Sequence, residues 1–195
     1  MNILVDEFPE SLTVDGVNYA IDTDFRDVLR VILAYEDETL TQFERQLILL
    51  NNLYGDRIPR NTTDALERAL WFLNGGKDAQ QPQDTEETQT RLYSFSKDAN
   101  FIFSAFRQTH GIDLQKTSMH WWEFLALFMD LGSETTFSSL IGLRKRVKSG
   151  AATKEERAAA QSMGEVFEIP DPDTRTLDEK EAEAEFLRLV AKQGK

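Results

Sequence analysis

Apolar and polar residues alternate along a short stretch near the N-terminus, on both sides of Asp15-Gly16. A two-residue turn of type I′ requires positive φ at both central positions, and Asp-Gly is well suited to that requirement. The alternation therefore predicts a β-hairpin, and it is the only β element that we expect. Its apolar positions are Leu12, Val14, Val17, Tyr19 and Ile21.

Between residues 22 and 76 the apolar residues recur at every third or fourth position, which is the period of an α-helix. We expect three helices there, joined by short links. The residues expected to cap or end them are Asp22 or Thr23, the Thr41 to Glu44 capping box, Gly55, Asn61 to Thr63, and Gly75-Gly76. The positions expected to face inward are Phe25, Val28, Leu29, Ile32, Leu33, Phe43, Leu47, Leu50, Leu53, Leu66, Ala69, Leu70 and Leu73.

Residues 77–90 contain no large apolar side chain and cannot contribute to a core, so we expect a flexible linker there. Beyond it the helical period returns as far as residue 168. The fold class that these patterns predict is mainly α: a helical bundle of about six to eight helices with one short N-terminal β-hairpin. The expected caps are Ser96 or a neighbour, Ser118, Ser133 or a neighbour, and the Thr153 to Glu156 capping box.

The expected domain organisation is a single helical domain over 1–168, in which two helical halves, 1–76 and 91–168, are joined by the 77–90 linker. A Pro-rich break then separates 169–195 as an acidic C-terminal helical arm. Its few large apolar residues include Phe186, Leu187 and Val190. Because so little can be buried, we expect the arm either to dock on the parent bundle or to fold only on a partner.

Residues 120–124 read HWWEF and contain two of the three tryptophans and one of the two histidines. This group can be a catalytic pocket, a metal site or part of the core. On a helix capped by Ser118, apolar side chains cover most of the circumference, which is typical of a helix in the middle of a bundle. The core motif that we predict comprises Trp121, Trp122, Phe124 and Phe128, with Leu125, Met129 and Leu131 also turned inward.

The same helix leaves one narrow stripe that contains His120, Glu123 and Asp130. As a metal site, His120 and Glu123 would form half of a carboxylate-bridged two-metal centre, which needs a second such pair. The only other histidine, His110, has no glutamate three residues away. We therefore interpret the stripe as the solvent-facing edge of the core and expect no metal and no cofactor.

Composition restricts the chemistry further. The absence of cysteine excludes disulfides, thiolate catalysis and cysteine-ligated zinc. No G-x-S-x-G nucleophile motif is present, and Gly75-Gly76-Lys77 ends a helix instead of opening one, so catalytic residues are not expected. A net charge of −12 disfavours nucleic acid, and the basic group at 144–148 is explained by cations in a last helical turn. No apolar run is long enough for a membrane span and no signal peptide is evident, so we expect a cytoplasmic protein.

An ordered set of motifs resembles the phage gene-product-fifteen family of tailed phages and prophages of Gram-positive bacteria. The motifs lie within residues 10–168, and no single one of them is specific. They are Ile21-Asp-Thr-Asp-Phe-Arg26, Ile58-Pro59, Trp71-Phe-Leu-Asn-Gly-Gly-Lys77, the run from Tyr93 to Phe106, Gly111-Ile-Asp-Leu114, His120-Trp-Trp-Glu-Phe124 and Phe137-Ser-Ser-Leu-Ile-Gly-Leu-Arg144.

The resemblance implies a gene in the tail module, between the tail-tube and tape-measure genes, where small acidic helical proteins resemble tail assembly chaperones. It implies no catalytic residues. The function expected from it is a non-enzymatic chaperone that binds the tape-measure protein, with the tail-tube protein and a second copy of itself as further possible partners. Such a protein would act in the host cytoplasm and be absent from the mature virion. The alternative is a minor structural component of the tail.

Client contacts in the C-terminal arm are a weaker expectation. Phe186, Leu187 and Val190 have too little helix of their own to pack with, so they can contact a client or dock onto the parent bundle. The sequence leaves both alternatives open.

Overall fold

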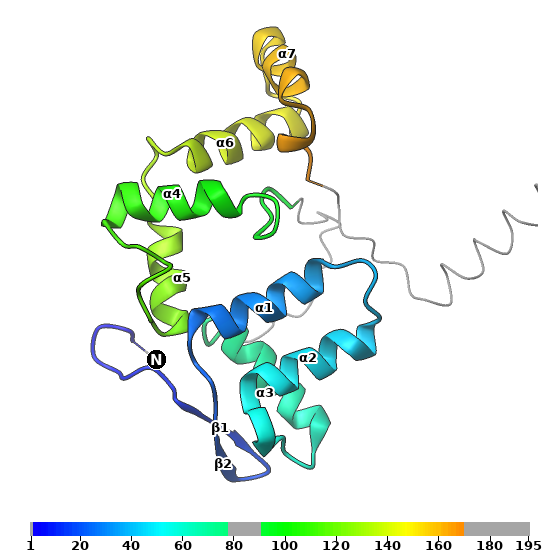
Figure 1. Ribbon diagram of the computed structural model, residues 1–195, viewed down its shortest axis with the longest axis vertical. Helices are drawn as coiled ribbons and strands as arrows, with labels where there is room; N and C mark the ends of the chain where they lie inside the picture. The colour runs from blue at the N-terminus through cyan, green and yellow to red at the C-terminus, as the bar shows by residue number, and fades with distance from the viewer. Residues whose placement is uncertain (1, 78–90, 170–195) are drawn as a thin grey trace, which may run out of the picture.

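The computed structural model describes residues 2–77 and 91–169 (Figure 1). Within these residues it is mainly α, with seven α-helices and one two-stranded antiparallel sheet, as the sequence predicts. Most of the expected linker and arm, including Phe186, Leu187 and Val190, lies outside the described residues. The elements are β1 (Ser11–Val14), β2 (Val17–Ala20), α1 (Phe25–Glu36), α2 (Gln42–Tyr54), α3 (Thr62–Leu73), α4 (Ala99–His110), α5 (Trp121–Met129), α6 (Thr136–Lys148) and α7 (Lys154–Met163), with short 3-10 turns at Gly55–Arg57 and Gly164–Val166.

The hairpin has the turn that Asp15-Gly16 predicts. Asp15 and Gly16 both have positive φ, 49° and 77°, and Val14 pairs with Val17 across the turn. The turn is tied to the start of α3, because the Asp15 N–H donates to Asp64 Oδ2 at 3.0 Å and Asn61 Nδ2 donates to Asp15 Oδ1 at 3.0 Å. The hairpin therefore lies against the start of α3.

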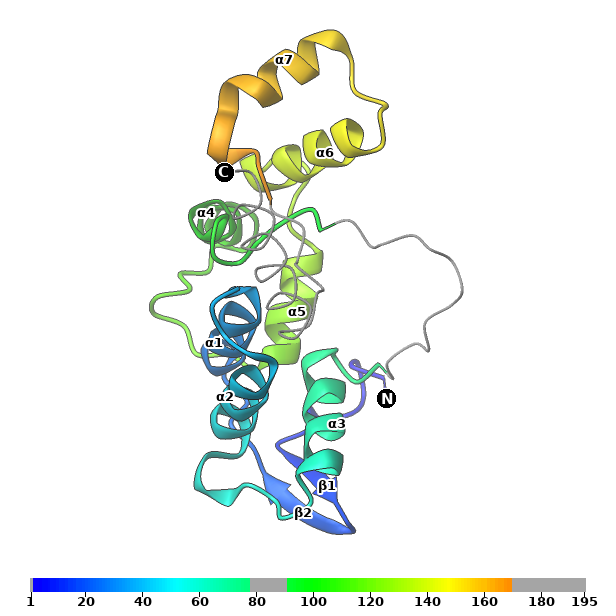
Figure 2. The same ribbon diagram turned by 90° about the vertical axis from the view of Figure 1, so that its right-hand side faces the viewer.

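The helices lie in two groups that are joined by α5. Helices α1, α2 and α3 pack beside the hairpin, α4 and α6 lie above them, and α5 runs between the two groups (Figures 1 and 2). The junction is a short antiparallel bridge in which the Phe25 N–H donates to the Met119 carbonyl at 3.1 Å and the Trp121 N–H donates to the Thr23 carbonyl at 2.8 Å. A single cluster of buried side chains draws on both groups. Helix α7 packs on α6 and projects from the body (Figure 2).

The caps agree with the sequence at Thr41, Asn61 and Thr153 and differ at α1, α4, α5 and α6. Helix α4 begins after Asp98, which makes no side-chain capping hydrogen bond, and α6 is capped by Thr135. Asp24, and neither Asp22 nor Thr23, caps α1, because its carboxylate accepts the Arg26 N–H. The cap of α5 is His120 in place of Ser118, whose hydroxyl instead donates to Asp24 Oδ2 at 2.5 Å. The bridge between Asp24 and His120 fixes both helix starts.

Several residues expected to face inward are exposed. Phe43 and Leu47 on α2 are 72% and 44% exposed, because α2 turns Leu49, Leu50, Leu53 and Tyr54 toward the core. Leu33 on α1 and Leu70 on α3 are 41% and 42% exposed. Periodicity predicts an apolar stripe but does not determine how much of that stripe a neighbouring helix covers.

Arg144 is a further residue for which the sequence interpretation is wrong. It was expected among the cations of the last turn of α6, yet it is 1% exposed and pairs with buried Asp98 at the start of α4. Its Nη1 and Nη2 donate to the two carboxylate oxygens at 2.7 and 3.0 Å. Its remaining N–H groups donate to the carbonyls of Leu92, Val166 and Phe167, so all five donors are used.

Breaking this pair tests its contribution to stability. We expect Asp98→Ala to lower the free energy of unfolding by about 3–5 kcal/mol, because it leaves a buried guanidinium without its counter-charge. Arg68→Ala is the control: it removes a 54% exposed guanidinium from a pair with Asp64 and should change stability by less than about 1 kcal/mol. Urea denaturation followed by circular dichroism measures both, and equal effects would contradict the assignment.

Candidate functional site

The HWWEF motif begins α5 and holds it against α3. The Trp122 N–H donates to His120 Nδ1 at 3.0 Å, so the imidazole is the helix cap. Because Nδ1 accepts, Nε2 carries the proton and donates to the Pro9 carbonyl at 3.1 Å. Both ring nitrogens of the neutral imidazole are therefore occupied by backbone groups.

The two tryptophans fulfil a second capping role. Trp121 Nε1 donates to the Leu73 carbonyl at 2.9 Å, and Trp122 Nε1 donates to the Phe72 carbonyl at 2.8 Å. These carbonyls belong to the last turn of α3, where a helix has no intrahelical donors left for them. The Phe72 carbonyl also accepts the Gly75 N–H, at 3.1 Å. The predicted core residues Trp121, Trp122, Phe124 and Phe128 are 1%, 6%, 0% and 8% exposed.

The stripe beside the motif does not assemble a catalytic or metal site in the described part of the chain. Glu123 and Asp130 are exposed, and no group of three or more His, Asp or Glu side chains there can hold a metal ion. His110 Nε2 lies 2.9 Å from the Leu127 carbonyl. Met129, which was expected to face inward, is 82% exposed because α5 ends beyond the cover of α3.

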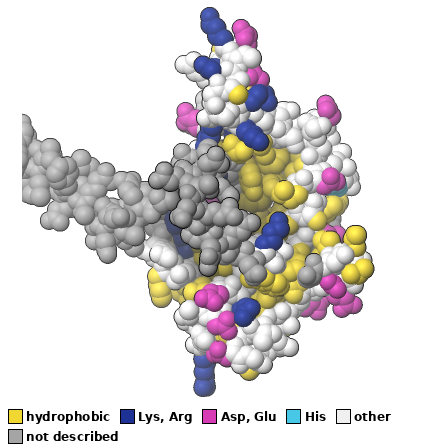
Figure 3. Space-filling view, turned by 180° about the vertical axis from the view of Figure 1, so that it is seen from behind, with side chains coloured by type: hydrophobic (Ala, Val, Ile, Leu, Met, Phe, Trp, Pro, Cys, Tyr) yellow, Lys and Arg dark blue, Asp and Glu magenta, His cyan; other side chains and the backbone are white. Residues whose placement is uncertain are grey.

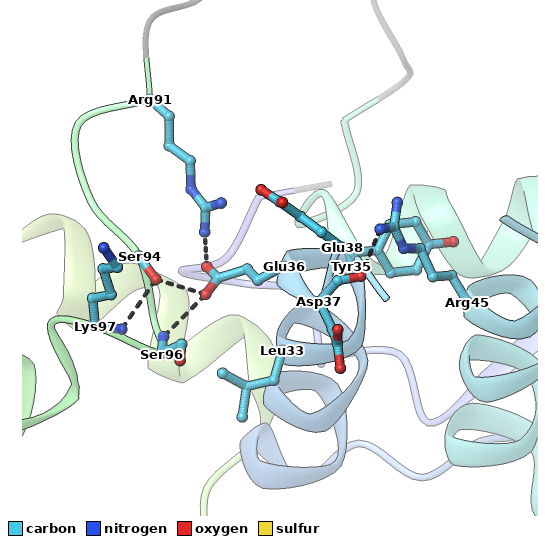
Figure 4. Close-up of a pocket in the computed structure, with 10 residues that line it drawn as sticks. All are labelled: Leu33, Tyr35, Glu36, Asp37, Glu38, Arg45, Arg91, Ser94, Ser96 and Lys97. Atoms are coloured by element: carbon cyan, nitrogen blue, oxygen red, sulfur yellow. Dashed lines mark hydrogen bonds and ion pairs between the residues drawn. The ribbon is translucent and has the colours of Figure 1, made fainter. Parts of the chain in front are cut away.

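A polar pocket of about 380 Å³ lies where the end of α1 meets the segment before α4 (Figure 4). At its centre Glu36 accepts the Ser94 hydroxyl at 2.7 Å and the N–H groups of Phe95 and Ser96 at 3.0 Å each, and it is ion-paired with Arg91. These donors saturate the carboxylate. Glu36 therefore anchors the 91–97 segment.

A larger and more apolar groove lies between the end of α3 and α5. It holds about 580 Å³. The N-terminal residues beside it are strongly exposed: Leu4 by 87% and Val5 by 79%. Figure 3 shows hydrophobic side chains gathered over the middle of one face of the molecule. The residues that line this α3–α5 groove include Ile3, Leu73, Gly75, Gly76, Trp122, Leu125 and Met129.

A second apolar groove of about 360 Å³ lies between α1 and α4. Its walls carry Leu29 and Leu33 from α1 and Ile102 and Phe103 from α4, with Phe95 at one end. Surfaces of this kind accept apolar side chains of a helix, and contiguous exposed apolar area on a protein typically marks an interaction site. The geometry therefore favours binding of other polypeptide over catalysis.

Comparison with known proteins identifies a family for the chain. The family model described as Bacteriophage Gp15 protein matches residues 4–169, which is most of the chain. The chain belongs to the bacteriophage Gp15 protein family. This membership indicates a structural or assembly role in a phage. No curated protein and no solved structure matches the chain. Among the described helices of this Gp15 family member, none is both long enough and apolar enough to cross a bilayer.

Sequence reasoning did not find the two grooves. The apolar run Ile3-Leu4-Val5 and the position of Met129 at a helix end were visible signals of exposed apolar surface. Neither signal locates a groove, because each groove lies between two elements that are far apart in the sequence, and their spacing is set by the tertiary packing.

Gly76 tests how closely the α3–α5 junction is packed. A Cβ at Gly76 would lie 2.6 Å from the Trp122 ring, whereas one at Gly150 would meet nothing within 4 Å, and both glycines have φ near +77°. Both Ala variants bear the strain of positive φ, but we expect Gly76→Ala to be roughly 1–3 kcal/mol less stable than Gly150→Ala because of the overpacking. Thermal or urea unfolding measures the difference, and equal stability would show that the junction is loosely packed.

His120 gives the stability a pH dependence. Burial lowers the pKa of the His120 imidazole below its usual 6.5, although the Pro9 carbonyl and the carboxylates of Glu10 and Glu123 act in the opposite direction. The imidazole of the unfolded chain then binds a proton more readily than that of the folded chain. The stability that neutral His120 contributes is therefore complete above pH 6.5 and is lost as the pH falls toward the folded-state pKa. We expect the free energy of unfolding to decline between pH 7.5 and 5.5, and less so in His120→Asn, which keeps a capping oxygen. Parallel curves for the two proteins would contradict this assignment.

Proposed function

We propose that this protein is a non-enzymatic tail assembly chaperone that binds the tape-measure protein of its phage and assists assembly of the tail tube. The observation that carries the proposal is the α3–α5 groove with the exposed N-terminal residues beside it. Together they form an apolar surface of the kind that accepts an amphipathic helix.

The chemistry of this surface fits a long helical client. Met129 is unbranched and polarizable, so it can adapt to different apolar side chains along a repeated helix. A net charge of −12 keeps a protein with such exposed apolar area from associating nonspecifically.

Co-expression with the tape-measure protein tests the proposal. We expect the tape-measure protein to become soluble and to co-purify with the unsubstituted chain. Met129→Asp, which adds a charge to the groove, should reduce the co-purified amount on the order of tenfold. Phe43→Asp is the matched control, because Phe43 is also an exposed apolar side chain, 72% against 82%, but lies outside the groove.

An insoluble tape-measure protein, or equal loss in both variants, would count against client binding in this groove. Mass spectrometry of purified particles then separates the chaperone from its alternative. A chaperone is absent from the finished tail, whereas a minor structural component is present in fixed copy number.

A further inference from the structure

The α1–α4 groove adjoins the polar pocket near which the described chain ends. Leu33 lines both this groove and the polar pocket around Glu36, so the two depressions adjoin. Lys97 of the polar pocket donates through Nζ to the Glu168 carbonyl at 3.3 Å. The described chain therefore ends beside the polar pocket that adjoins this groove.

This point of departure is fixed by buried contacts. Arg144 donates to the carbonyls of Phe167 at 2.8 Å and Val166 at 2.6 Å, and the same guanidinium is paired with Asp98 at the start of α4. Ile169 itself is 7% exposed. Whatever follows Ile169 thus starts from a defined position relative to α4.

We propose that residues 177–190 of this chain bind in the α1–α4 groove, with Phe186, Leu187 and Val190 against its apolar walls. On a helix these three side chains fall within about 100° of arc, since successive residues are about 100° apart. These three side chains would form an apolar face that packs against the apolar walls of the groove. The proposal concerns the chain alone and does not rest on the proposed chaperone function.

The distances allow this arrangement. The seven residues from Pro170 to Thr176 can span up to about 25 Å when extended, which exceeds the length of either helix that forms the groove. Residues 177–190 as a helix would be ~21 Å long, and α1 and α4, at 12 residues each, are ~18 Å long. Segment and groove are therefore of similar length.

The tether makes even weak binding effective. A short flexible linker holds a segment near its site at an effective concentration on the order of 1 mM. An intrinsic dissociation constant of ~0.1 mM would then leave the segment bound about ten times as often as free. An exposed apolar groove beside a tethered apolar segment is thus expected to be filled by it.

Hydrogen exchange of the full chain, measured by mass spectrometry without any client, tests the proposal. We expect the amides of 177–190 to exchange about tenfold more slowly in the unsubstituted protein than in Leu33→Asp, which places a charge in the groove wall. Leu70→Asp is the matched control, because Leu70 is as exposed as Leu33, 42% against 41%, but lies on α3 away from this groove. It should leave the exchange of 177–190 unchanged.

A second variant acts from the side of the segment and changes no residue of the described body. Leu187→Asp should accelerate exchange in 177–190 as Leu33→Asp does, and it should also deprotect the amides of α1 and α4. Three results would overturn the proposal: exchange of 177–190 at the rate of a free peptide in the unsubstituted protein, protection that Leu33→Asp leaves intact, and protection that rises with protein concentration, which indicates a second copy in the groove. Because no tape-measure protein is present, none of these results bears on the chaperone proposal.

Discussion

Two buried indole N–H groups donate to two backbone carbonyls at the end of α3, and the arrangement of the helices depends on these two hydrogen bonds. A buried tryptophan needs an acceptor for its N–H, and the last turn of a helix has carbonyls without donors. Trp121 and Trp122 donate to the carbonyls of Leu73 and Phe72 and so fix the start of α5 against the end of α3. The chain reverses at Gly76 directly against the Trp122 ring, where a side chain would not fit.

Arg144 performs the corresponding task for the second helical group. A guanidinium buried to this extent is tolerated only when its charge is balanced and its donors are used. Asp98 supplies the charge, and carbonyls from the segment before α4 and from the segment after α7 supply the remaining acceptors. The pair therefore fixes where the chain enters α4 and where the described residues end at Ile169.

The tryptophan hydrogen bonds and the Arg144–Asp98 pair hold the fold together, and the exposed apolar surfaces remain available for binding. His120, Glu36 and Arg144, the side chains most suggestive of chemistry, are each saturated by structural hydrogen bonds. Among the described residues, the surfaces that no other part of the protein covers include apolar ones: the groove between α3 and α5, the groove between α1 and α4, and exposed side chains such as Met129. In the function that we propose, this Gp15 family member would recognise polypeptide through the shape and apolar area of these grooves.

The sequence by itself determined the elements whose causes are local. Asp15-Gly16 specified the hairpin turn, the Thr41 and Thr153 capping boxes specified two helix starts, and the apolar density around Trp121 specified a central helix. Only the tertiary structure decided the roles that need a distant partner. His120 caps α5 because the segment from Thr23 to Phe25 pairs beside it. Arg144 is buried because the chain brings Asp98, 46 residues away in sequence, into contact with it. Leu33 is exposed because α4 does not close over α1. Periodicity records which side of a helix is apolar, whereas burial depends on which other element arrives there, and that is set by packing of the whole chain.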